Sequence, residues 1–201
     1  MVAESGARLL DHDAQLVLLE QIVPRATVLT PNVPEARILA GKRVDMAGLG
    51  LEGQADLERG RSRLWNPPGP TRPDSAAEFT DADFEELARA VLALGPRTVV
   101  LTGGHRARTV DLLVDSEDAG AAVEIPGVRH PEGAAHGSGC THSSVLAAQL
   151  ALGRTPLQAA RVARRLAGEA VARGLRDIGA GAGPVDIIGL ERLRGGIIEE
   201  R

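Results

Sequence analysis

Cysteine and aromatic residues are scarce in this sequence of 201 residues. Cys140 is the single cysteine, and the aromatic residues are Trp65, Phe79 and Phe84. A lone cysteine has no partner for a disulfide within the chain, so a disulfide scaffold is excluded. So few aromatic rings provide no stacking platform for single-stranded nucleic acid.

Long hydrophobic runs are also missing. No apolar run approaches the roughly 18 residues that a membrane span requires. The segment Met1–Leu10 lacks the basic region and following apolar stretch of a signal peptide. We therefore expect a cytoplasmic protein with no membrane contact. The chain carries 23 basic and 27 acidic residues, for a formal net charge of -4, so bulk electrostatics does not favour nucleic acid as a partner.

The composition is otherwise that of a globular protein, with 43% hydrophobic and 25% charged residues. The length predicts a single domain over residues 1–201. Residues 42–79 are rich in proline and arginine and show little regular pattern, so we expect a loop insertion there.

Apolar periodicity predicts alternating helices and strands. Helices are expected at about 13–23, 34–41, 81–94, 141–152 and 156–173, and strands at about 26–30, 98–102, 109–114 and 122–125, the last two as a strand pair. Gly41 is expected to end the second helix, and Thr80 with Asp83 to begin the third as a capping box. This alternation predicts an α/β fold, with a mostly parallel sheet flanked by helices.

A glycine-rich turn precedes the helix expected at 141–152. Gly137, Ser138 and Gly139 are small, so a ligand could approach the backbone closely, and the helix N-terminus would attract an anion. The turn therefore indicates either phosphate binding or a tight turn selected for packing. Cys140 follows directly, where the helix N-terminus would favour a thiolate. It could act as a base, a nucleophile or a backbone donor, or be a small buried hydrophobic residue.

Two further groups follow expected strands, where ligands bind in open α/β sheets. Asn32 and Glu35 carry the oxygen atoms that a hydrated magnesium ion accepts, although helix capping by Asn32 and dipole pairing by Glu35 is the favoured interpretation. Thr102, Gly103 and His105 could contact a nucleotide, although a plain turn is favoured on the residues alone.

Six segments carry a family resemblance when they occur in this order. They are MVAESG at Met1, TPNVPEA at Thr30, VVLTGGH at Val99, VDLL at Val110, AHGSGCT at Ala135 and GAGAGPV at Gly179. Together they resemble the hydroxymethylpyrimidine/phosphomethylpyrimidine kinases of thiamine biosynthesis, which belong to the ribokinase-like superfamily.

The resemblance implies a role for each matched residue. Gly137, Ser138, Gly139 and Cys140 would form the anion hole for the transferring phosphoryl group, with Cys140 where sugar-kinase relatives carry an aspartate base. Asn32 and Glu35 would hold Mg2+ through water. The nucleotide site would be lined by Asn32, Thr102, Gly103, His105 and Thr141, and the final helix would border the adenine.

The implied reaction moves the γ-phosphoryl group of ATP to 4-amino-5-hydroxymethyl-2-methylpyrimidine and then to its monophosphate. Two alternatives stay open: a pyridoxal or pyridoxine kinase of the same superfamily, and a non-catalytic nucleotide-binding remnant or subunit. Thr102 stands where many members carry lysine, which supports the second alternative. The resemblance also implies a homodimer.

The resemblance further implies that N-terminal strand–helix units are missing. In the family, several such units precede a segment like MVAESG, so Met1 is expected to be an internal methionine of a longer protein. A chain without these units would expose one edge of its sheet. We therefore expect the 201 residues alone to be poorly soluble or oligomeric.

Overall fold

The computed structural model describes residues 10–48, 80–103, 109–118, 121–131, 133–176, 178 and 183–189. Its helices are α1 (His12–Val17), α2 (Val33–Gly48), α4 (Asp81–Leu92), α5 (Ser138–Ala151) and α6 (Pro156–Ala172). Its strands are β1 (Val28–Leu29), β2 (Thr98–Leu101), β3 (Val110–Asp115) and β4 (Val123–Pro126). A π-helical turn and a 3-10 turn continue α1, over Leu18–Ile22 and Val23–Arg25.

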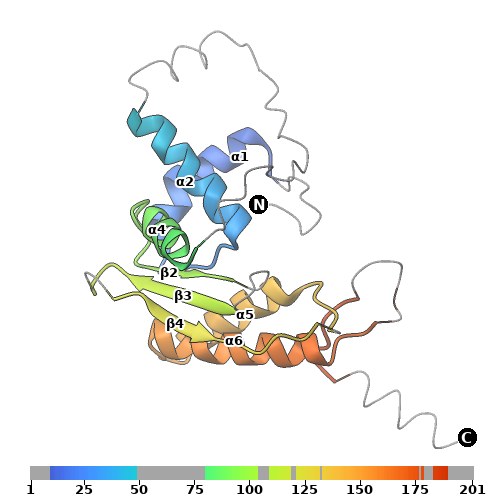
Figure 1. The fold of residues 1–201 in the computed structure, drawn as a ribbon. Coiled ribbons are helices and arrows are strands. Elements are labelled where there is room, and N and C mark those ends of the chain that lie inside the picture. The colour runs from blue at the N-terminus through green and yellow to red at the C-terminus, as the bar shows by residue number, and fades with distance from the viewer. Residues whose placement is uncertain are drawn as a thin grey trace, which may run out of the picture.

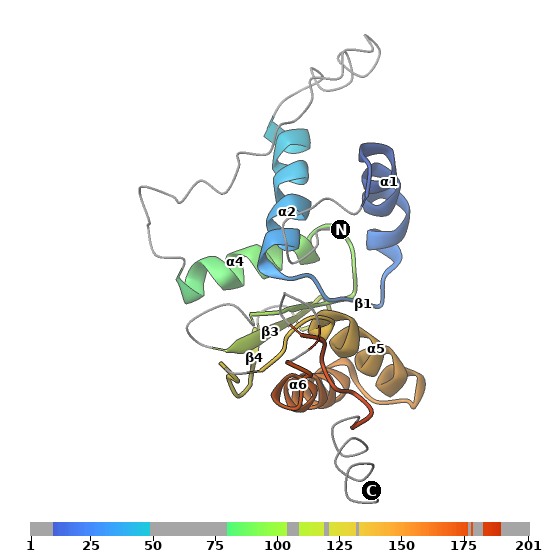
Figure 2. The same cartoon turned by 90° about the vertical axis from the view of Figure 1, so that its right-hand side faces the viewer.

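Helices cover both faces of the sheet, which has the strand order β1-β2-β3-β4 (Figure 1). α1, α2 and α4 lie on one face and α5 and α6 on the other, as the view turned by 90° also shows (Figure 2). Because successive side chains of a strand point to opposite faces, a central strand between two helical layers buries the side chains on both of its faces. All four residues of β2 are buried. The predicted α/β fold class is confirmed.

The sheet is mixed rather than mostly parallel in the described part of the chain. β1 and β2 pair in parallel, whereas β2 with β3 and β3 with β4 pair antiparallel. The cause is connection length, because short turns join antiparallel strands and a parallel pair needs a long crossover. Only the β1–β2 connection is long, and it contains α2 and α4.

The end of α2 differs from the sequence expectation. α2 passes through Gly41 and ends at Gly48, so residues 42–48 of the expected insertion are helical, while 49–79 lie outside the described residues. A glycine that ends a helix usually adopts a positive φ, and Gly41 is not among the described glycines that do. Within a helix, glycine costs only about 1 kcal/mol relative to alanine, so α2 continues.

The predicted capping box at the start of α4 is confirmed. The Thr80 hydroxyl oxygen accepts the Asp83 N–H at 3.2 Å, and Asp83 Oδ2 accepts the Thr80 N–H at 2.8 Å. The Thr80 hydroxyl also donates to Asp83 Oδ2 at 2.7 Å. These hydrogen bonds from the Thr80 side chain and backbone lower the pKa of the exposed Asp83 carboxyl.

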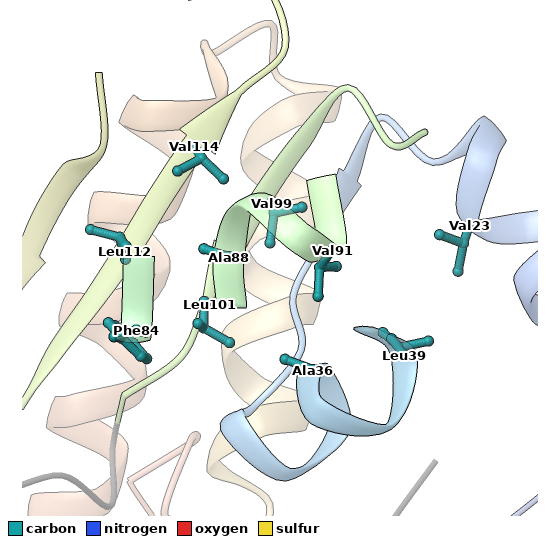
Figure 3. Packing of buried hydrophobic residues seen from close by; sticks show 10 residues of the cluster. All are labelled: Val23, Ala36, Leu39, Phe84, Ala88, Val91, Val99, Leu101, Leu112 and Val114. Carbon is teal, nitrogen blue, oxygen red and sulfur yellow. The ribbon is translucent and has the colours of Figure 1, made fainter. Parts of the chain in front are cut away.

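Two hydrophobic cores lie on the two faces of the sheet. One packs β2 and β3 against α2 and α4, and Figure 3 shows its buried side chains, among them Leu39, Phe84 and Val99. The other packs Val100, Leu113 and Ile125 against α5 and α6. α6 contributes Ala159, Ala160 and Ala163 to this core, and its Ala167 and Ala170 are also buried. No helix in the described ranges is long and apolar enough to cross a membrane.

Candidate active site

The glycine-rich turn lies within the first turn of α5. We expected this helix to begin at about Thr141, but it begins at Ser138, so that Ser138, Gly139 and Cys140 are its first three residues. Gly137 is the N-cap residue, with a φ of 87° that favours glycine. No side chain caps the helix. No side-chain acceptor therefore satisfies the backbone N–H groups of the first turn, which need another partner.

The front of this turn faces open space. Gly139 and Cys140 are exposed, and no atom lies within 4 Å of the point where a Cβ of Gly139 would stand. Among the described residues, neither the Gly139 nor the Cys140 N–H has a hydrogen-bond partner. Exposure argues against Cys140 as a buried hydrophobic residue, and packing does not explain Gly139. The geometry suits an anion at this helix N-terminus.

The back of the turn is closed by hydrogen bonds. The buried Thr141 donates both its N–H and its hydroxyl to the Gly137 carbonyl oxygen at 2.9 Å. The Ser138 N–H is donated to the Ala135 carbonyl oxygen at 3.0 Å. Ser138 and Thr141 thus hold the turn in shape, while Gly139 and Cys140 present their N–H groups to a ligand.

The segment 183–185 supports the glycine-rich turn, a role that the sequence alone did not predict. The His136 N–H is donated to the Gly183 carbonyl oxygen at 3.2 Å, and the Val185 N–H to the His136 carbonyl oxygen at 3.0 Å. A Cβ on Gly183 would stand 1.7 Å from the Leu175 carbonyl oxygen, so only glycine fits. The one feature of the sequence that could have indicated this contact is Gly183, the glycine before Pro184.

Asn32 and Glu35 form a capping box at the start of α2. The Glu35 N–H is donated to Asn32 Oδ1 at 2.9 Å, and the Asn32 N–H to Glu35 Oε2 at 3.2 Å. This is the capping interpretation that the sequence favoured. The described residues contain no group of three or more His, Cys, Asp or Glu side chains arranged for a metal. The two side chains fit a hydrated Mg2+ held through water, but not a cage of protein ligands.

Thr102 and Gly103 serve the fold at the end of β2. The Thr102 N–H is donated to the Pro31 carbonyl oxygen at 2.9 Å, and Thr102 forms an isolated parallel bridge with Asn32. The Gly103 N–H is donated to Asp111 Oδ1 at 3.1 Å, and a Cβ on Gly103 would stand 2.1 Å from the Val110 carbonyl oxygen. Neither backbone N–H is left for a nucleotide. His105 lies outside the described residues.

A buried cluster of three charged or titratable side chains connects the end of β2 with α5. No local pattern in the sequence predicted it. Asp111 on β3, His142 on α5 and Arg164 on α6 have side-chain exposures of 0%, 5% and 14%. Asp111 Oδ2 lies 3.4 Å from His142 Nε2 and 3.6 Å from Arg164 Nε. The signal in the sequence was Asp111, a charge in the middle of the apolar strand VDLLV.

A cavity of about 680 Å³ lies between β4 with its following segment and α6. Its lining includes Gly127, Val128, His130, Arg164, Arg165 and Gly168. A few residues after His130 the chain reaches Gly137, so one segment connects the cavity to the turn of α5. The volume lies in the range of small-molecule sites, and α6 forms one wall, where the resemblance placed the adenine.

Fold and site together define a class. In an α/β domain, an uncapped helix that begins at a glycine suits the binding of an anionic group such as a phosphate. A family model described as phosphomethylpyrimidine kinase matches residues 1–56 and 74–186. The chain belongs to the phosphomethylpyrimidine kinase family, and the resemblance seen in its motifs is confirmed.

Curated relatives agree with this assignment. The hydroxymethylpyrimidine/phosphomethylpyrimidine kinase of Synechococcus elongatus is 32% identical over 188 residues, which cover 92% of this chain and 57% of the relative. The thiamine biosynthesis bifunctional protein ThiED of Geobacter sulfurreducens is 32% identical, covering 96% of this chain and 32% of the relative. The chain thus spans little more than half the length of the first relative, and about a third of the second.

Solved structures share the fold. The ADP complex of Bacillus subtilis pyridoxal kinase has a TM-score of 0.65 at 25% identity and covers 92% of this chain and 58% of that protein. The pyridoxal kinase of Staphylococcus aureus in complex with AMP-PCP and pyridoxal has a TM-score of 0.66 at 20% identity, and covers 93% and 57%. The ribokinase-like fold implied by the motifs is thereby confirmed.

Proposed function

We propose that this chain carries the ATP-binding and phosphoryl-transfer part of a kinase for 4-amino-5-hydroxymethyl-2-methylpyrimidine and its monophosphate. The open N-terminus of α5 carries the proposal. Its free N–H groups at Gly139 and Cys140 and its positive dipole end suit the negative charge on a phosphoryl group in transfer. Membership of the phosphomethylpyrimidine kinase family supports the substrate.

The proposed reaction is an in-line transfer. The hydroxymethyl oxygen attacks the γ-phosphorus, a new O–P bond forms, and the bond between the γ-phosphorus and the β–γ bridging oxygen breaks to release ADP. The hydroxyl proton passes to the Cys140 thiolate, which acts as the base. The Gly139 and Cys140 N–H groups stabilise the charge on the phosphoryl oxygens. Protein groups mainly position the reactants and stabilise charge.

Nucleotide and metal are assigned to the residues around this turn. The cavity beside α6 would take the adenine, because the segment 131–136 leads from it to the glycine turn. Mg2+ would neutralise the phosphates, held through water by Asn32 and Glu35. Thr141 would support the phosphate site from behind, and Thr102, Gly103 and His105 stay predictions from the resemblance. A homodimer and a cytoplasmic location likewise stay predictions.

A Cys140→Ala variant tests the catalytic part. We expect turnover, followed as ADP released with the pyrimidine alcohol as acceptor, to fall by about 10²–10⁴-fold, the usual contribution of a general base. The fold should be unaffected, because the thiol is exposed. Ser144→Ala, an exposed change on the same helix, is the control. Turnover unchanged in Cys140→Ala would contradict the base role, and no turnover in the unaltered protein would favour the nucleotide-binding subunit.

A pyridoxal kinase is the second candidate, because the structure resembles the Bacillus subtilis pyridoxal kinase at 25% identity. The two candidates share the phosphoryl-transfer chemistry and differ in the acceptor alcohol. We expect kcat/KM for the hydroxymethylpyrimidine to exceed that for pyridoxal. Measuring kcat/KM for both alcohols under the same conditions distinguishes the two candidates. A higher kcat/KM for pyridoxal would assign the chain to vitamin B6 metabolism.

A further inference from the structure

Three charged or titratable side chains lie together in the core between the sheet and its α5–α6 layer. Asp111 is fully buried, and His142 and Arg164 approach the same carboxylate oxygen at 3.4 and 3.6 Å. Those distances are longer than good hydrogen bonds. Within the described part of the chain, four of the atoms are buried without a hydrogen-bond partner, namely Asp111 Oδ2, His142 Nδ1 and Nε2, and Arg164 Nε. Burial of such groups opposes folding, so packing does not explain the cluster.

The cluster connects both ends of the β2–β3 turn. Asp111 Oδ1 accepts the N–H of Gly103, where the turn begins. Arg164 Nη2 donates to the carbonyl oxygen of Thr109, where the turn ends, at 3.1 Å. One carboxylate and one guanidinium therefore bind Gly103, just after β2, and Thr109, just before β3.

The same carboxylate also reaches the helix that carries the glycine turn. His142 lies two residues after Cys140 on α5, and its side chain faces inward while Cys140 faces solvent. Its Nε2 approaches Asp111 Oδ2. The described contacts thus run from the β2–β3 turn through Asp111 to the first turns of α5.

We propose that Asp111, His142 and Arg164 are positioning residues that fix the first turn of α5, with its free N–H groups and Cys140, relative to the end of β2 and the start of β3. They do not touch the transferring group. The arrangement suits this role because a contact between charged groups specifies one orientation of α5 on the sheet. The nucleotide part of the test rests on the proposed function, and the thiol part does not.

Alkylation of Cys140 reports on the turn without any assumption about activity. Cys140 is the only cysteine, so iodoacetamide labels one site. Reactivity of a thiol at a helix N-terminus depends on the ordered N–H groups around it. We expect His142→Leu to slow alkylation at least threefold and to weaken binding of Mg-ATP at least tenfold, measured by calorimetry, while a cooperative melting transition is kept.

His142→Gln retains a side-chain donor and should restore both values to within twofold of the unaltered protein. Ser144→Ala, exposed on the same helix, should change neither. Asp111→Asn keeps an oxygen for the Gly103 N–H but loses the charge, and it provides the test if His142→Leu does not fold. We expect the alkylation rate of Asp111→Asn to fall as that of His142→Leu does.

The outcomes separate the two proposals. If the unaltered protein binds no Mg-ATP, the proposed function fails, and the alkylation rates still test positioning. If a folded His142→Leu or Asp111→Asn is alkylated at the unaltered rate, the cluster is a packing feature and the inference is wrong. A higher melting temperature of His142→Leu together with slower alkylation would support it, because a merely stabilising role would lower the melting temperature.

Discussion

The two ends of the candidate site use their polar groups in opposite ways. At the carboxyl ends of β1 and β2, Asn32 and Glu35 cap each other, and the Gly103 N–H is donated to Asp111. At the N-terminus of α5, Gly139 and Cys140 leave their N–H groups without a partner among the described residues. Both regions looked like ligand sites in the sequence. The contrast shows that residue types alone do not tell paired polar groups from unpaired ones.

The same contrast explains why two glycines have different roles. A Cβ on Gly103 would collide with the backbone of β3, whereas a Cβ on Gly139 would meet nothing within 4 Å. Gly103 is therefore required by packing, whereas packing does not require a glycine at position 139. Chemically identical substitutions at these positions should separate folding from binding.

The largest expected effect is the loss of stability in Gly103→Ala. The methyl group would stand 2.1 Å from the Val110 carbonyl oxygen, so the main chain must shift. We expect the free energy of unfolding to fall by about 3 kcal/mol or more, the upper part of the range for overpacking. Denaturant titration measures it.

Gly139→Ala is the matched variant. Alanine is favoured over glycine in a helix, so stability should be unchanged or rise by up to about 1 kcal/mol. The methyl group would project into the space in front of the free N–H groups, and binding of ATP should weaken at least tenfold. A Gly139→Ala protein that binds ATP normally would contradict the anion site, and an equally stable Gly103→Ala protein would contradict the packing role of Gly103.

A smaller effect is expected from Glu35→Gln. Glutamine keeps an oxygen for the Asn32 N–H, so the capping box survives, and loss of the charge near the helix N-terminus should cost less than about 1 kcal/mol. If Glu35 also holds hydrated Mg2+, the Mg2+ concentration that gives half-maximal ATP binding should rise severalfold. Calorimetric titration of ATP at a series of Mg2+ concentrations measures it.

Asp83→Asn is the control for this change, because it removes a charge from the capping box of α4 rather than from that of α2. Asp83→Asn should not change the Mg2+ concentration that gives half-maximal ATP binding. An unchanged requirement in Glu35→Gln as well would mean that Asn32 and Glu35 act only as a helix cap.

Local signals in the sequence predicted much of the fold. Apolar periodicity located the main helices and strands, and Thr80 with Asp83 identified the start of α4. The parallel character of the sheet was overestimated, because apolar strands look alike in either direction and the short connections on both sides of β3 decide the pairing. The prediction that Gly41 ends the second helix was wrong. A glycine that ends a helix usually adopts a positive φ, and Gly41 does not.

The site was predicted less completely than the fold. The glycine turn and Cys140 were found because their residue types carry the signal in one short segment. Asp111, His142 and Arg164 come from three separate elements, and Gly183 supports His136 from nearly 50 residues away. Those contacts depend on how helices pack on the sheet, which no local pattern encodes.

The smallest expected effect concerns the capping box that has no role at the site. Thr80 lowers the pKa of Asp83 below its ordinary value of 3.8 by hydrogen bonds from its side chain and backbone. A carboxyl whose pKa is lowered by folding stabilises the fold at pH values above its unfolded pKa, and this contribution is lost as the pH falls through the folded pKa. Asp83→Asn should therefore lower the melting temperature slightly near neutral pH.

That small difference should shrink as the pH falls below about 4, where the ordinary carboxyl of an unfolded chain takes up its proton. Melting curves of both proteins at a series of pH values measure it. Thr80→Ala is the control, because it removes the side-chain hydrogen bond and should show a weaker version of the same pH dependence. A difference between the proteins that stays constant down to acid pH would show that the Asp83 charge does not stabilise α4. The hydrogen bonds of this capping box, and not the charge of its carboxylate, would then account for its contribution to stability.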